Sequence, residues 1–165
     1  MSTKPIPYSV TIIPTVSTSN QQVTLVSQAL GPVIGPPTLA RHNKNIPKGY
    51  SHRGFNIFDG YTKNPVLLLF QNPPANQLPS GWSLQQVGFA SDPEFSVSFG
   101  PGSQSILGPQ GQTTWDFTVP VNCVGVIYWN RKSNTTIHKY TYQFGNGSSS
   151  QIVDPPITND PNPEQ

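Results

Sequence analysis

The sequence predicts a single all-β domain, an antiparallel β-sandwich or jelly roll of about eight or nine strands joined by long Pro/Gly-rich loops. Short segments in which apolar and polar residues alternate recur along the chain, and a period of two is typical of strands with one buried face. Turn-forming residues separate these segments, since the chain contains 14 glycines and 19 prolines. No segment has the apolar period of an amphipathic helix.

The first predicted strands form a pair near the N-terminus. Residues 8–13 and 23–30 both alternate, and the turn-forming residues 17–20 join them. In the second strand the alternation places Ala29 on the buried face with the valine and leucine before it. It places Gln28 on the face exposed to water.

The middle of the chain contains three further predicted strands. Residues 66–70 (VLLLF) are apolar throughout, which predicts a strand buried on both faces. In residues 82–89 the alternation changes phase, and a β-bulge near Gln85 and Gln86 would restore it. Residues 95–99 alternate phenylalanine or valine with serine and predict a strand with one buried face.

Residues 113–144 are predicted to form a β-meander around which the core packs. Residues 113–119 alternate strictly, with Trp115 on the buried face. Residues 123–129 are apolar on both faces, which predicts a central strand covered on both sides. Residues 140–144 return to a pattern with one buried face.

The chain is expected to be one β-sandwich domain, residues 1–153, followed by a flexible Pro/Asn-rich tail, residues 154–165. The N-terminus has no apolar signal core, and no apolar run approaches the roughly 18 residues of a membrane span. We therefore expect synthesis in the cytoplasm, with release or assembly into a larger particle left open. The single cysteine, Cys123, lies in an apolar segment and is expected to act as a small buried hydrophobic residue.

The sequence lacks the residue patterns of common enzymes and metal sites. The motifs GxSxG, GxxxxGK[ST], HExxH and paired CxxC do not occur. His42, His52 and His138 show no local zinc-binding spacing. The acidic residues are few, and Asp92, which precedes Pro93, is expected to be a turn residue. We expect no enzymatic activity, no cofactor and no bound metal.

The charge of the chain is low and unevenly distributed. Charged residues make up 10% of the chain, against about 25% in ordinary soluble domains. Residues 1–58 carry five bases and no acid, whereas residues 59–165 carry four bases and seven acids. The net charge of +2 gives little counterion release, so we do not expect nucleic acid as a partner.

Residues 31–54 contain four prolines and four of the nine basic residues, and they are predicted to form a long loop. Loops longer than about 12–15 residues are usually functional or disordered. Their cations, amides and aromatic ring could bind an anionic head group, phosphate or an acidic partner surface, and the exposed tyrosines Tyr50 and Tyr61 could stack on sugar rings. The alternative is a solvated loop that keeps a charge-poor protein in solution. The candidate binding residues are Arg41, His42, Lys44, Lys48, Tyr50, His52, Arg53 and Tyr61.

Three short stretches, WDF (115–117), YWN (128–130) and SNT (133–135), resemble the second half of the aegerolysins. Aegerolysins are small β-sandwich proteins, related in fold to actinoporins, that bind membrane lipids. The resemblance covers about twenty residues and implies a β-sandwich. Aegerolysins continue past the Tyr-Trp pair with an acidic residue and Cys-Pro-Trp, whereas this chain has NRK (130–132), so no lipid-binding residue is carried over.

Two functions are consistent with these features. The first is a non-enzymatic recognition module that binds carbohydrate or a membrane lipid head group through loops at one end of the sandwich. Low charge, amide-rich loops and surface aromatic rings suit neutral polyols. The second is a self-assembling structural protein, such as a coat, filament or inclusion-crystal subunit, because low charge reduces repulsion and Pro-rich arms can lie along a neighbour. A homo-oligomer is expected.

Overall fold

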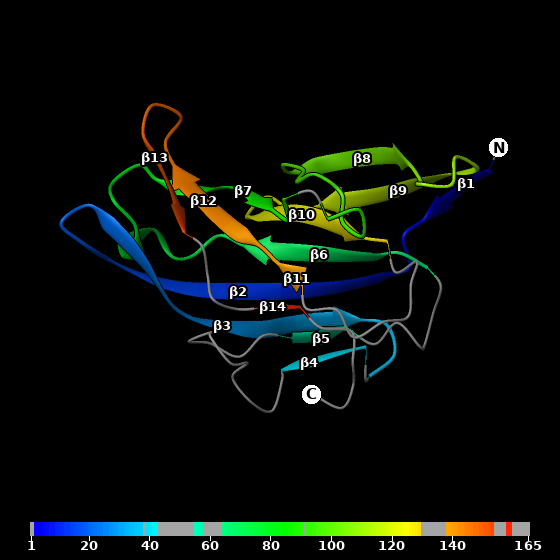
Figure 1. The fold of residues 1–165 in the computed structure, drawn as a ribbon, viewed down its shortest axis with the longest axis horizontal. Helices are drawn as coiled ribbons and strands as arrows, with labels where there is room; N and C mark the ends of the chain where they lie inside the picture. The colour runs from blue at the N-terminus through cyan, green and yellow to red at the C-terminus, as the bar shows by residue number, and fades with distance from the viewer. Residues whose placement is uncertain are drawn as a thin grey trace.

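The computed structural model describes residues 2–37, 39–42, 55–57, 64–90, 92–129, 138–153 and 158–159. These residues form β-strands and one 3-10 helix and contain no α-helix, so the all-β prediction is confirmed (Figure 1). Among them there is no helix with the length and apolar character needed to cross a membrane. The elements are β1 (Ser2–Pro5), β2 (Tyr8–Ser19), β3 (Gln22–Ile34), β4 (Ala40–His42), β5 (Phe55–Ile57), β6 (Val66–Gln71), η2 (Ala75–Gln77), β7 (Ser83–Gly88), β8 (Gly102–Leu107), β9 (Thr113–Val119), β10 (Cys123–Tyr128), β11 (His138–Lys139), β12 (Thr141–Gly145), β13 (Ser150–Val153) and β14 (Thr158–Asn159).

The strands of the described residues form four sheets, named here after one strand of each. The β6 sheet has the order β10-β6-β2-β3, the β9 sheet β1-β9-β8, the β12 sheet β13-β12-β7, and the β5 sheet β11-β14-β5-β4. Three pairs are parallel: β1 with β9, β2 with β6, and β14 with β5. The prediction of a purely antiparallel fold is therefore wrong. Strands β2 and β6 can run in parallel because the long segment between them provides the crossover that such a pair requires.

The β6 sheet is buried on both faces where β6 and β10 lie. One face contributes Val66, Leu68 and Phe70 to a main core, defined as the buried cluster shared by the β6, β12 and β5 sheets. The other face contributes Leu67 and Leu69 to a second core, which the β9 sheet completes. Successive residues of β6 thus enter different cores, so the prediction that this strand is buried on both faces is confirmed.

The predicted meander of residues 113–144 is wrong in its pairing. Strand β9 pairs with β1 and β8, β10 pairs with β6, and β12 pairs with β7 and β13. The number of buried faces was correctly predicted, because β9 and β12 have one and β10 has two. The prediction that residues 123–129 form a central strand is wrong, because among the described residues β10 is the last strand of its sheet and its outer side makes only isolated bridges. Its two buried faces are due to the sheets above and below it and not to strands on both sides. Trp115, expected inside, is only partly buried at the rim of the second core.

The hairpin of β2 and β3 is longer than predicted. Asn20 and Gln21 form the turn with φ values of 52° and 65°, as a two-residue turn between twisted strands requires. Strand β3 then continues to Ile34, so residues 31–34, predicted as loop, belong to a strand. A register shift leaves Val26 unpaired and reverses the alternation after it.

The predicted faces of Gln28 and Ala29 are consequently wrong. Gln28 is buried, with 8% of its surface exposed, and Ala29 is exposed. By contrast, the bulge predicted near Gln85 is confirmed, because Gln143 pairs with Gln86 and Phe144 with Leu84.

Residues 95–99 do not form the regular strand that their alternation predicts. Phe95 and Phe99 make isolated bridges to β10, and Val97 between them is 73% exposed. The Ile127 N–H donates to the Ser96 side-chain hydroxyl at 2.8 Å, which replaces a backbone acceptor. Phe95 enters the main core and Phe99 packs against the second core, so this segment passes around the edge of the β6 sheet.

The C-terminal part of the chain is described at residues 158–159, which form β14 between β11 and β5. Residues 154–157 and 160–165 lie outside the described residues. The domain limits at residues 153 and 154 stay a prediction.

We expect Gly125→Ala to destabilise the fold by about 1–3 kcal/mol, the usual cost of overpacking a core. A Cβ atom at Gly125 would lie 2.7 Å from Cγ2 of Val119, a stiff β-branched side chain of the second core. Gly88→Ala is the matched control, because its Cβ would meet only Thr141 Oγ1 at 3.5 Å. Urea unfolding should show a lower free energy of unfolding for Gly125→Ala and an unchanged one for Gly88→Ala. Equal free energies of unfolding for the two variants would contradict the close approach of β9 and β10.

Candidate functional site

The structure describes two of the eight predicted site residues, Arg41 and His42. Both lie on β4, where Arg41 is exposed and the His42 ring centroid lies 5.0 Å from that of Phe55. The other six lie outside the described residues: Lys44, Lys48, Tyr50, His52, Arg53 and Tyr61. Their grouping into one site therefore stays a prediction.

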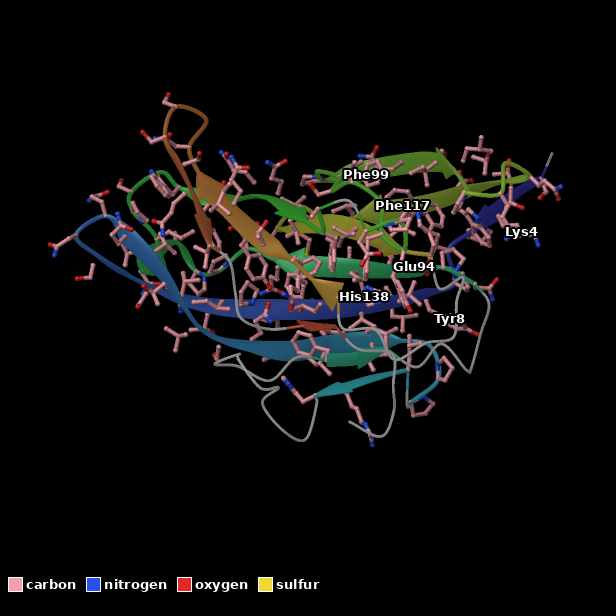
Figure 2. The ribbon with its side chains drawn as sticks, in the orientation of Figure 1. Lys4, Tyr8, Glu94, Phe99, Phe117 and His138 are labelled. Carbon is pink, nitrogen blue, oxygen red and sulfur yellow. The ribbon has the colours of Figure 1, made fainter. Side chains whose placement is uncertain are left out.

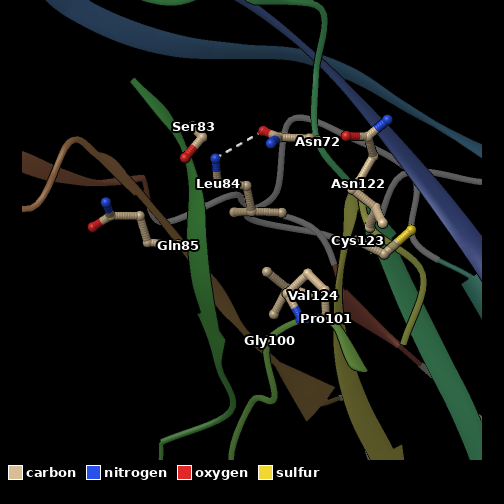
Figure 3. Close-up of a pocket in the computed structure, with 10 residues that line it drawn as sticks. Asn72, Ser83, Leu84, Gln85, Gly100, Pro101, Asn122, Cys123 and Val124 are labelled. Carbon is tan, nitrogen blue, oxygen red and sulfur yellow. Dashed lines mark hydrogen bonds between the residues drawn. The ribbon is translucent and has the colours of Figure 1, made fainter. Parts of the chain in front are cut away.

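A small pocket lies between two sheet edges instead. Strand β7 is an edge of the β12 sheet and β10 is an edge of the β6 sheet. The pocket has a volume of about 200 Å³ and opens between these strands, with residues 100–101 contributing to its wall (Figure 3). Its polar lining consists of Asn72, Ser83, Gln85, Asn122 and Cys123.

Asn72 organises the wall of this pocket. It follows the last residue of β6, and its side-chain Oδ1 accepts the Leu84 N–H at 2.8 Å, the bond drawn in Figure 3. Its own backbone N–H donates to the Asn122 carbonyl oxygen at 2.7 Å. One residue therefore joins the end of β6 to β7 and to the turn before β10. Gln85 and Asn122 are exposed and Ser83 is partly buried, and Figure 3 shows the Gln85 side chain on the side of β7 away from Asn72 and Asn122.

The chemistry of the pocket is neutral. No described residue that lines it carries a formal charge, and each polar side chain except the thiol is an amide or a hydroxyl, able both to donate and to accept. Burial raises the pKa of the Cys123 thiol above its usual value, so the thiol stays protonated at neutral pH and is a poor nucleophile. The arrangement suits hydrogen bonding to an uncharged ligand.

A hydrogen bond between a buried histidine and a partly buried aspartate joins β11 to the residues after β7. His138 is 3% exposed, and its Nδ1 hydrogen-bonds Asp92 Oδ2 at 2.6 Å. Asp92 Oδ1 also accepts the Glu94 N–H at 3.0 Å, which is the turn role predicted for it. The sequence could not reveal the pair, because 46 positions separate its members. Within the described part of the chain, no group of three or more His, Cys, Asp or Glu residues is placed to hold a metal ion.

A second buried polar group lies inside the main core. Gln28 Nε2 donates to the Tyr140 hydroxyl at 2.8 Å, and the Tyr142 hydroxyl donates to Gln28 Oε1. Both tyrosines are fully buried, and desolvation raises the pKa of each well above its usual value.

Figure 2 shows His138 and Glu94 close to the centre of the molecule, whereas Lys4 lies at its margin. These interior groups do not line the pocket.

Comparisons of the chain with protein-family models, with curated proteins and with solved structures find no match.

Asp92→Ala should destabilise the protein by about 1–3 kcal/mol, because it leaves a buried His138 nitrogen without its acceptor. Asp116→Ala is the control: Asp116 is exposed and its Oδ1 accepts the Ser105 hydroxyl at the surface, where substitutions usually change stability by less than about 0.5 kcal/mol. Chemical denaturation at neutral pH measures both. Equal losses would contradict the interior role of Asp92.

The stability of the fold should fall as the pH rises above about 10, the ordinary pKa of tyrosine. Above that pH the unfolded chain loses tyrosine protons that Tyr140 and Tyr142 retain in the folded state, so each lowers stability by up to about 1.4 kcal/mol per pH unit. Tyr142→Phe should reduce this slope by one tyrosine's share. Urea unfolding between pH 8 and about 11.5 compares the slopes, and identical slopes would contradict the burial of the Tyr142 hydroxyl.

Proposed function

We propose that this chain is a non-enzymatic recognition module that binds a neutral, hydroxyl-rich ligand, a carbohydrate unit, in the pocket between β7 and β10. The β6 and β12 sheets then act as a β-sandwich, and the binding site lies between β7 of one sheet and β10 of the other. The observation that carries the proposal is the uncharged polar lining of the pocket, held in place by the hydrogen bonds of Asn72.

A small sugar matches this pocket in its hydrogen-bonding groups and in its size. A hydroxyl donates and accepts at once, as do the side chains of Ser83 and Asn122 and the amide of Gln85. A pocket volume of about 200 Å³ is below the roughly 300–1,000 Å³ of drug-sized sites, so it fits one small unit rather than a long chain. Lipid head groups usually carry a phosphate, which would need a cation that the described lining residues do not supply.

Binding at one such pocket should be weak. None of its described lining residues is aromatic, so the site lacks the ring-stacking surface that adds area and geometry to sugar recognition. Useful affinity would then require several pockets acting together, because linked sites raise avidity by increasing effective concentration. A recognition module of this kind is expected to work as an oligomer.

Two alternatives remain as proposals. A membrane lipid head group is favoured by the basic residues predicted to gather near Arg41, which could pair with its phosphate. Self-assembly into a structural particle is favoured by the open sheet edges, since unpaired strand edges are templates for pairing with another chain.

The carbohydrate proposal predicts that Ser83→Ala combined with Asn122→Ala weakens ligand binding about tenfold, because two hydrogen bonds are lost at about 0.5–1.5 kcal/mol each. A glycan array identifies the best ligand, and isothermal titration measures its Kd. The control Gln110→Ala removes an exposed amide outside the pocket and should bind like the parent. All variants should have the parent's Tm.

Two results would reject the pocket as the site. One is full binding by the double variant. The other is loss of binding on Arg41→Gln together with capture on anionic lipid vesicles, which would favour the lipid alternative.

A further inference from the structure

Strand β1 is attached to the fold almost entirely through its backbone. All four of its side chains are exposed, and its pairing partner is β9, in a parallel register from Ser2 opposite Thr113 to Pro5 opposite Asp116. The Ser2 N–H donates to the Gln112 carbonyl oxygen at 3.3 Å, and the Ser2 and Thr113 hydroxyls hydrogen-bond at 3.3 Å. We infer that β1 exchanges between two copies of this chain, each β1 pairing with the β9 of the other copy.

The segment that joins β1 to β2 has the character of an exchange hinge. Strand β1 ends at Pro5 and β2 begins at Tyr8, so only Ile6 and Pro7 connect a strand of the β9 sheet to a strand of the β6 sheet. The two prolines restrict φ on either side of Ile6, and short, restricted hinges favour domain swapping. Ile6 packs against the second core and its N–H donates to the Asp116 carbonyl oxygen at 2.9 Å, so it moves with β1 in the exchange and makes the same contacts in the other copy.

The edge of β9 that β1 covers is suited to pairing with the β1 of a second copy. If β1 detaches, β9 keeps β8 on one side and presents unpaired backbone groups on the other, next to the partly buried Trp115 of the second core. A bare strand edge pairs readily with an extended segment. The β1 of a second copy has the register for this edge already, because it matches the same residues in its own copy. At a net charge of +2, repulsion between copies is small.

Protein concentration determines whether β1 pairs with the β9 of its own copy, the closed form, or with that of another copy, the exchanged form. Both forms contain the same β1–β9 contacts. They differ in the strain of the hinge and in whether the paired strands belong to one covalent chain. A short tether corresponds to an effective concentration in the millimolar range. Exchange should therefore increase as protein concentration approaches about 1 mM. A reciprocal exchange closes into a two-fold dimer, and a non-reciprocal one gives an open chain of copies.

Disulfide trapping tests the exchange directly. Thr3 and Thr114 are register neighbours, so cysteines at these positions lie within the range of a disulfide when β1 pairs with β9. Thr3→Cys and Thr114→Cys are prepared separately in a Cys123→Ser background, one of them isotopically labelled, then mixed at high concentration, incubated and oxidised. The control pairs Thr3→Cys with Thr118→Cys, which lies on β9 beyond the residues that pair with β1.

The inference predicts that the covalent heterodimer forms at least tenfold more in the Thr3–Thr114 mixture than in the control, as measured by mass spectrometry, and that its yield falls on dilution. Equal yields would overturn it, as would a double Thr3→Cys/Thr114→Cys chain that oxidises only within itself at every concentration. A four-residue Gly/Ser insertion between Ile6 and Pro7 relaxes the hinge and should lower the heterodimer yield. An unchanged yield would show that the hinge does not drive exchange. Neither measurement depends on whether the pocket binds sugar.

Discussion

The constraint on which the fold depends is that β6 and β10 are apolar on both faces and must be covered on both. The main core covers one face with Phe70 in contact with Tyr140 and Tyr142, at ring-centroid distances of 5.7 and 5.8 Å. The second core covers the other face through the β9 sheet, which approaches closely at Gly125. Two separate sheets must therefore stack on one. This explains why strands adjacent in sequence, such as β9 and β10, lie in different sheets.

Each open sheet ends in strands whose outer backbone groups have no neighbouring strand. The chain pairs some of these backbone groups with side chains. Gln151 of β13 accepts the Val23 N–H at 2.9 Å and donates to the Val23 carbonyl oxygen at 2.9 Å, so its amide takes the place of a neighbouring strand on β3. The bulge at Val26 further disrupts that edge, as bulges commonly do. The edges beside β7 and β9 are different, because the first opens into the pocket and the second is covered by β1.

Sequence patterns predicted local burial well and long-range pairing poorly. Residues 66–70, the bulge near Gln85 and the two-faced burial of β10 follow from alternation, which a strand expresses whatever its neighbour is. The meander and the position of Gln28 were wrong, because pairing depends on contacts between distant residues and one unpaired residue in β3 reverses every later face. The pocket was missed for the same reason: Asn72, Ser83 and Asn122 meet only when three strands from two sheets come together.

The proposed exchange of β1 is compatible with ligand binding in the pocket and would compensate for its weakness. The pocket offers a few neutral hydrogen bonds and, among its described residues, no aromatic surface, so a single copy has little binding energy to use against the cost of ordering a ligand. Exchange of β1 joins copies without using the β7–β10 edge, because β1 pairs with β9 and none of its residues lines the pocket. An assembly formed in this way would keep its pockets open and hold them at a fixed spacing. Weak sites at fixed spacing favour a repetitive ligand, such as a polysaccharide or a glycan-covered surface, over a single sugar in solution.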